Sequence, residues 1–145
     1  MSVVRNKKAF FDYNILEKIN CGIVLVGSEV KSIKNGNVEL KGSYCYIDNG
    51  EVFIKGMNIS EHKQGGKANN HEPLRDRKLL LKKKEIKNLE ESLGQNGLTL
   101  IPLEVFVTKT GLIKVEIGLG RGKNSVDKKQ SLKEKDLKRE LERNI

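Results

Sequence analysis

The most restrictive feature of the sequence is a turn signal that separates two alternating segments. Asp48-Asn49-Gly50 lies between residues 38–47 and 51–59, and apolar and polar residues alternate in both segments. Asn-Gly pairs favour the tight turns of β-hairpins, and a period of two is typical of strands with one buried face. The pattern therefore predicts a β-hairpin, with Phe53 on its outer face. The residues expected on the core face of the second strand are Val52, Ile54 and Met57.

A second pair of strands is predicted over residues 98–108 and 112–120. Both segments are rich in apolar and β-branched residues, and the turn residues Lys109-Thr110-Gly111 separate them. Pro102 has no N–H to donate, so the first of these strands should lie at an edge or contain a bulge.

The remaining elements are predicted from shorter patterns. Residues 1–8 are short and basic, and we expect them to be mobile. Alternation from Phe11 predicts a strand that is interrupted at Gly22. Helices are predicted over residues 27–36 and 82–93 from the spacing of their apolar residues. The expected fold class is mainly β with flanking helices, as an oligonucleotide-binding-type closed antiparallel β-barrel, although periodicity alone does not fix that topology.

The charge of the chain points to a polyanionic partner. The 145 residues carry a formal net charge of +9, which favours nucleic acid. Proteins that grip single strands by stacking display several aromatic side chains, whereas this chain has no Trp, four Phe and three Tyr. Folded RNA is therefore favoured over a splayed single strand.

Three consecutive leucines, Leu79 to Leu81, lie inside a cluster of cations. In an extended segment, Leu79 and Leu81 would face the core and Leu80 would face outward. There it could pack on a base or ribose while the cations hold phosphates. The alternative is that all three leucines are core and the cations form a solvated rim, and the pattern does not decide between them. The cations in question are Arg75, Arg77, Lys78 and Lys82.

Other polar motifs favour structural roles. His62 and His71 have no third ligand in view, so neither a metal site nor a cofactor is expected, and no catalytic arrangement stands out. For Glu29 and Lys31, an ion pair is favoured slightly over RNA contact. Cys21 and Cys45 form no CxxC motif, and we expect them to be small buried residues.

These cysteines are also compatible with a reducing cytoplasm, and we expect a cytoplasmic monomer. The N-terminal residues lack an apolar run long enough for a signal peptide, and no segment reaches the length of a membrane span.

The C-terminal segment differs from the rest of the chain. We expect residues 1–120 to form an RNA-binding domain and residues 121–145 to form a basic tail. Gly118, Gly120 and Gly122 lack the spacing of a phosphate-binding loop and are interpreted as a flexible exit. At this exit, Arg121 and Lys123 are expected to contact RNA phosphates. The apolar residues of the tail are too sparse for a stable isolated helix, which predicts disorder alone and a helix when docked.

Five stretches resemble the SsrA-binding protein family (small protein B, SmpB), and they follow the family order along nearly the whole chain. They are NKKAFFDYNI (6–15), GSEVKSIKNGNVEL (27–40), GEVFIKGMNI (50–59), NHEPLRDRKLLLKKKEI (70–86) and IKVEIGLGRGKNSVDKK (113–129).

The resemblance implies an adaptor without chemistry of its own. It implies binding to the tRNA-like part of transfer-messenger RNA (SsrA RNA) and entry into a stalled ribosome. It also implies that the tail occupies the decoding centre and the empty mRNA path as a helix.

The resemblance implies individual contacts too. RNA contacts fall at Leu80, at Asn20, where many relatives have Glu, and at Lys82. In the tail, the family triplet D-K-R becomes Asp127-Lys128-Lys129, expected to bind the ribosome, and Val126 stands where relatives often have an aromatic residue or His. Lys129 keeps a positive charge but not the forked donor geometry of Arg.

Two alternatives stay open at this point. One is a generic oligonucleotide-binding barrel with a non-specific polybasic tail. The other is a nuclease or phosphotransferase, which would need an acidic metal site that the sequence does not indicate.

Overall fold

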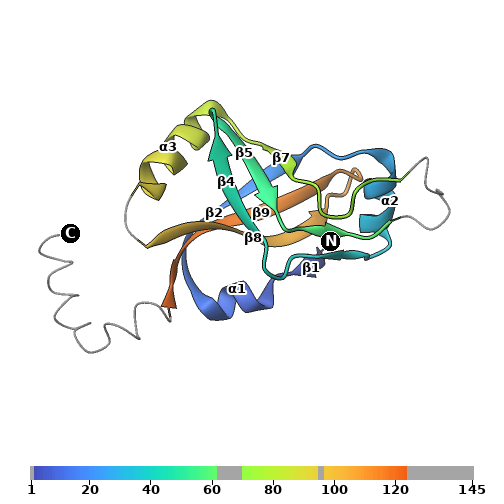
Figure 1. The fold of residues 1–145 in the computed structure, drawn as a ribbon, viewed down its shortest axis with the longest axis horizontal. Coiled ribbons are helices and arrows are strands. Elements are labelled where there is room, and N and C mark those ends of the chain that lie inside the picture. Colours follow the sequence, from blue (N-terminus) through green and yellow to red (C-terminus); the bar gives the residue numbers. More distant parts are fainter. Residues whose placement is uncertain (1, 62–69, 95–96, 124–145) are drawn as a thin grey trace, which may run out of the picture.

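The computed structural model describes residues 2–61, 70–94 and 97–123 (Figure 1). Within these ranges the chain is mainly β, with three helices. In chain order the elements are β1 (Ser2–Arg5), α1 (Lys7–Asp12), β2 (Tyr13–Ile23), α2 (Gly27–Lys34), β3 (Val38–Glu39), β4 (Tyr44–Asp48), β5 (Glu51–Lys55), β6 (Asn58–Ile59), β7 (Arg77–Leu80), α3 (Lys83–Leu93), β8 (Leu98–Val107) and β9 (Ile113–Gly122).

Seven strands form one antiparallel sheet in the order β1-β8-β4-β5-β7-β2-β9. Strand β8 also pairs with β9 along most of its length, so the pairings run from β8 around to β9 and back to β8. Strands β3 and β6 form a separate two-stranded sheet. In Figure 1, α3 and α1 lie on opposite sides of the strands, and α2 lies at one end.

Both predicted hairpins are confirmed. Strands β4 and β5 are joined at Asn49 and Gly50, whose φ angles of 52° and 74° suit the tight turn that the Asn-Gly pair predicts. In the β8–β9 hairpin, the register shifts between Pro102 and Glu104. The predicted bulge at Pro102 is therefore present, although β8 is an interior strand with β1, β4 and β9 as partners.

The N-terminal prediction is wrong. The described residues before Lys8 are not mobile: β1 pairs with β8, and the Asn6 side chain caps α1 by accepting from the Ala9 amide. Phe11 belongs to this helix and is 75% exposed, so the strand begins only at Tyr13. The partner of β1 lies about a hundred residues away in the chain, which local alternation cannot reveal.

Most residues of the main hydrophobic core come from the strands of the seven-stranded sheet. This core includes the predicted inward residues Val52, Ile54 and Met57, while Phe53 is only half-buried. Helix α3 contributes Leu89 to this core. The two cysteines are part of it as free thiols. Burial and the charge of Glu85 raise the pKa of Cys21 to about 12, so this thiol is not reactive at neutral pH.

A second, smaller hydrophobic cluster, formed by Ala9, Ile101 and Leu103, lies beneath α1. The prediction of a flexible exit at the glycines of β9 is wrong. Gly118 and Gly120 are buried strand residues, not a flexible exit. A Cβ at Gly118 would lie 2.6 Å from Leu103 Cδ1 and 3.1 Å from Ile15 Cγ2. These glycines let the side chains of β8 and β2 pack closely against the strand.

Gly118→Ala should therefore destabilise the fold. Overpacking of this kind costs about 1–3 kcal/mol, and a lower midpoint in urea unfolding would measure it. Gly27→Ala is the matched control, because nothing lies within 4 Å of its added Cβ. Equal midpoints for the two variants would contradict the close packing at Gly118.

Candidate nucleic-acid interface

The leucine triplet lies on β7, which pairs with β5 on one side and β2 on the other. Leu79 is 1% exposed and part of the core, whereas Leu80 is 51% exposed and Leu81 packs partly against the core. The predicted outward orientation of Leu80 is confirmed. Its contact with RNA stays a prediction.

A row of residues crosses three strands at Leu80. Leu80 lies opposite Gly22, and Gly22 lies opposite Lys114 on β9, so all three share the outer face. A Cβ on Gly22 would lie 3.4 Å from Leu80 Cβ, so the absent side chain leaves Leu80 uncovered on that side. Lys114 was not among the contact residues predicted from the sequence. Its alternation with Val115 indicated an outward position, but only the register of β2 against β9 places it beside Leu80.

Two of the predicted cations, Lys78 and Lys82, lie near this row. Lys78 shares the outer face of β7 and makes a 2.9 Å ion pair with Glu51, and both side chains are well exposed. Such exposed pairs contribute little stability and exchange readily for other partners. Lys82 is exposed at the start of α3.

The predicted RNA contact of Arg77 is wrong. Its side chain is 0% exposed, which excludes the predicted contact with RNA in this conformation. Its guanidinium donates to Glu29 Oε2 at 2.7 Å and to three backbone carbonyls. The carbonyls are those of Met57, Glu72 and Pro73.

Glu29, on α2, is also fully buried. The expected ion pair is confirmed for Glu29, whose partners are Arg75 and Arg77, whereas Lys31 is exposed and is not one of its partners. Burial by itself would raise the pKa of Glu29. Hydrogen bonds from Arg75, the Val26 amide and Arg77 outweigh burial and hold the pKa below its ordinary value. The carboxylate is therefore ionised at neutral pH, and burial in turn lowers the pKa of Arg77 against the opposing effect of Glu29.

Arg75 lies at the edge of this buried pair. It donates through Nε to Glu29 Oε2 at 2.9 Å and through Nη2 to Glu29 Oε1 at 2.7 Å. Its side chain is 33% exposed, so this predicted cation reaches the surface.

Segment 70–76 is fixed from a second direction by His71. This buried ring contacts Ser28 Oγ through Nδ1 at 2.7 Å and the Ile59 carbonyl through Nε2 at 2.8 Å. These contacts give His71 the structural role expected from the sequence, whereas His62 lies outside the described residues. No cluster of three or more potential metal ligands occurs within residues 2–61, 70–94 and 97–123. The helices in these ranges include none that is long and apolar enough to span a membrane.

Asn20 is exposed on β2, two residues before Gly22 and therefore on the same face. It lines a cavity of about 450 Å³ between β2 and α3. The other residues that line this cavity are Glu17, Lys18, Ile19, Glu85, Asn88 and Leu89.

The structure does not bring Arg121 and Lys123 to this face. Arg121 lies opposite Asn14, eight residues along β2 from Gly22, which corresponds to about 25 Å. Arg121 and Lys123 are half-buried at the far end of β9. The predicted tail residues Asp127, Lys128 and Lys129 lie outside the described residues.

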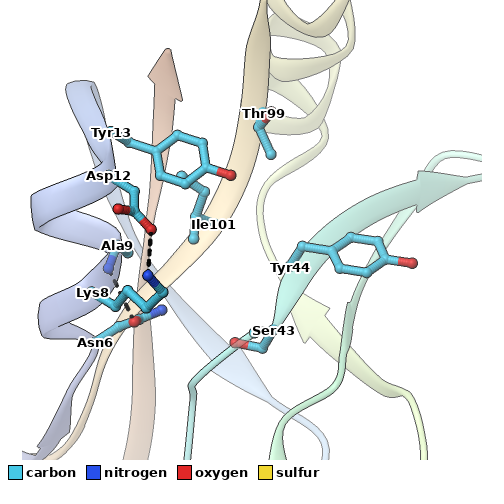
Figure 2. A pocket seen from close by; sticks show the side chains of 10 residues that line it. Asn6, Lys8, Ala9, Asp12, Tyr13, Ser43, Tyr44, Thr99 and Ile101 are labelled. Carbon is cyan, nitrogen blue, oxygen red and sulfur yellow. Dashed lines mark hydrogen bonds and ion pairs between the residues drawn. The ribbon is translucent and has the colours of Figure 1, made fainter. Parts of the chain in front are cut away.

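A separate cavity of about 290 Å³ lies between α1 and strand β4 (Figure 2). Figure 2 shows Tyr13 and Asp12 on one side of it and Ser43 and Tyr44 on the other. No predicted site residue lines it. The lining residues are Asn6, Lys8, Ala9, Asp12, Tyr13, Gly42, Ser43, Tyr44, Thr99 and Ile101.

A basic, mainly β chain with an exposed leucine among cations is typical of nucleic-acid-binding proteins. The chain belongs to the SmpB protein family, whose model matches residues 3–145. The SsrA-binding protein of Desulfitobacterium hafniense is 50% identical over 140 residues, which cover 97% of this chain and 88% of that protein. The SsrA-binding protein of Thermosynechococcus vestitus is 49% identical over 138 residues, or 95% of this chain and 90% of that protein.

The fold is also similar to a solved structure described as "tmRNA-SmpB: a journey to the center of the bacterial ribosome". The match has a TM-score of 0.70 and 42% sequence identity, and it covers 83% of each chain.

Low pH should lower the stability of the fold because Glu29 becomes protonated. Because the pKa of Glu29 is lowered from 4.5 by folding, its ionised form stabilises the protein above about pH 4.5. This contribution is lost as the pH falls below that value and through the folded-state pKa. We expect the urea midpoint, followed by circular dichroism, to fall over this range.

The control for this measurement is the double variant Glu29→Gln/Arg77→Met, which removes both buried charges together. Its midpoint should fall less steeply with acid. The same slope in both proteins would show that Glu29 is not responsible.

Proposed function

We propose that the protein is an RNA-binding adaptor of trans-translation. It binds the tRNA-like domain of transfer-messenger RNA and delivers that RNA to stalled ribosomes, so that the ribosome is rescued and the incomplete protein is tagged for degradation. Membership of the SmpB family along residues 3–145 and the names of the relatives support this proposal. The structural observation that carries it is Leu80, an exposed apolar side chain next to a glycine and among cations.

The proposed RNA contacts are those that the fold brings to one face. Leu80 packs on a base or ribose, while Lys78, Lys82 and Lys114 neutralise phosphates around it. Asn20 offers an amide to the same RNA from the neighbouring position on β2. Arg121 and Lys123 would meet a different part of the assembly, about 25 Å away.

We propose further that the ring of strand pairings is an oligonucleotide-binding-type barrel. The ring supports this assignment because β8 returns to β9 after the sheet has passed through β4, β5, β7 and β2. Residues 1–120 would then be the RNA-binding domain. Strand β9 extends two residues beyond this boundary, to Gly122.

The tail, residues 121–145, would enter the empty mRNA path of the ribosome and fold there into a helix. Asp127, Lys128 and Lys129 would contact the decoding centre. We propose that the protein acts in the cytoplasm as a monomer without a cofactor and catalyses no reaction of its own.

Leu80→Ala should weaken binding to the tRNA-like domain with the fold intact. Loss of the methyl and methylene groups that Leu80 would bury against the RNA corresponds to a decrease in affinity of roughly tenfold or more. Fluorescence anisotropy with a labelled tRNA-like domain measures this decrease. Leu112→Ala is the matched control, since Leu112 is 60% exposed but lies in the β8–β9 turn. Unchanged affinity for Leu80→Ala would remove Leu80 from the interface.

A competition experiment with two RNAs distinguishes the adaptor from a generic oligonucleotide-binding barrel. An adaptor for folded RNA should prefer the tRNA-like domain over an unstructured oligonucleotide of equal length, whereas a generic barrel with a polybasic tail should bind both alike. Both measurements are made at several salt concentrations, because the log–log slope is roughly −0.7 to −0.9 per phosphate neutralised.

Deletion of residues 127–145 should abolish tagging on stalled ribosomes and largely spare binding to the free RNA. The tail would contact the ribosome, whereas the RNA-binding face lies on β2, β7 and β9. A reconstituted tagging reaction and the anisotropy assay measure the two activities separately. Tagging that persists after the deletion would refute the proposed role of the tail.

A further inference from the structure

The carboxylate of Glu29 is fully buried and accepts four hydrogen bonds. Oε1 accepts from the Val26 amide at 2.9 Å and from Arg75 Nη2 at 2.7 Å, and Oε2 accepts from Arg75 Nε and Arg77 Nε. An ionised carboxylate has about four lone-pair positions, so this group is saturated. It holds two arginines from one segment against α2.

The two arginines differ in whether their positive charge is accessible to solvent. Arg77 is 0% exposed and is surrounded by Glu29 and backbone carbonyls. One carboxylate and two guanidinium groups leave this cluster with one positive charge in excess. Arg75 is the member that reaches solvent, so the excess charge is presented to the surface at Arg75.

The geometry of Arg75 leaves donors for an external acceptor. Its two short bonds to Glu29 use Nε and Nη2 and fix the plane of the guanidinium. Nη1 makes a long contact of 3.4 Å with the Asp76 carbonyl, and the second contact of Nη2 is 3.4 Å to the Val24 carbonyl. Bonds of this length are weak and are readily replaced by a phosphate oxygen.

Arg75 also lies close to the Leu80 row. Its contact at Val24 is two residues beyond Gly22, about 7 Å along β2. The Val24 amide in turn donates to the Lys78 carbonyl at 3.0 Å, which ties this end of β2 to β7. A nucleic-acid backbone next to Leu80 would therefore pass within reach of Arg75.

We propose that Glu29 is a positioning residue for RNA binding, which orients the guanidinium of Arg75 toward an RNA phosphate beside the Leu80 contact. This inference rests on the proposed function. Glu29 acts only through Arg75, and Arg77 neutralises the buried carboxylate so that the charge of Arg75 stays available. A fixed guanidinium loses less conformational freedom on binding than a mobile side chain.

The first experiment compares Arg75→Ala and Arg75→Lys in the full chain, with the labelled tRNA-like domain as the probe. Lys keeps the charge but cannot form the forked contact with Glu29. We expect both variants to lose about tenfold in affinity, as for a charge-assisted hydrogen bond. Lys109→Ala, an exposed cation in the β8–β9 turn, is the control for loss of charge alone. Wild-type affinity for Arg75→Lys would overturn the inference.

The second experiment measures Arg75→Ala again in the Glu29→Gln/Arg77→Met background, which lacks both charges of the buried pair. With its orientation lost, Arg75 should contribute only about twofold there, compared with about tenfold in the wild type. Equal losses in both backgrounds would show that Glu29 is merely structural. If the double variant does not fold, the comparison of Arg75→Lys with Arg75→Ala still decides whether binding depends on the forked contact between Arg75 and Glu29.

The two proposals fail in different ways. If the wild-type protein shows no preference for the tRNA-like domain, the proposed function itself is wrong. If that preference is present and Leu80→Ala reduces affinity while both Arg75 variants bind normally, only the role of Glu29 is wrong.

Discussion

The buried pair of Glu29 and Arg77 is the interaction on which the arrangement of the proposed RNA-binding face depends. Removal of Glu29 would leave the charge of Arg77 uncompensated in the core, which is strongly destabilising, whereas removal of Arg77 would leave Glu29 paired with Arg75 alone. Here every strong acceptor position of Glu29 is used, and Arg77 also binds the carbonyl of Met57 and those of the segment before β7. Helix α2, the end of β5 and the start of β7 are thereby held together. This contact fixes where β7 lies and so which of its leucines is exposed.

Glycines on the paired strands β2 and β9 have two different structural effects. Gly22 leaves Leu80 uncovered on the outer face beside Lys114. Gly118 and Gly120 instead admit Leu103 and Ile101 to the small cluster beneath α1. Missing side chains thus expose an apolar contact at one end of the strands and allow dense packing toward the other. The glycine-rich composition of β9 reflects packing rather than flexibility.

Sequence patterns predicted the features that depend on residues close together in the chain. The β4–β5 hairpin follows from its turn residues, and the exposure of Leu80 follows from alternation. The same alternation contained the signal for Arg77, since it places residue 77 with Leu79 on the inner face. A positive charge argued against burial, and only a buried carboxylate from α2, 48 residues away in the chain, makes that position acceptable. Pairing of β1 with β8 and the position of Lys114 require registers that no local pattern contains.

Strand β9 separates the two proposed contact regions of the domain. Lys114 lies near its start on the Leu80 face, whereas Arg121 lies near its end, opposite Asn14. Between them the strand is paired on both sides, with β2 and β8, so its bending is restricted. Arg121 therefore lies about 25 Å along the strand direction from the Leu80 face. A strand that is paired on both sides is a more rigid spacer between these two regions than the flexible exit at Gly118 that the sequence suggested.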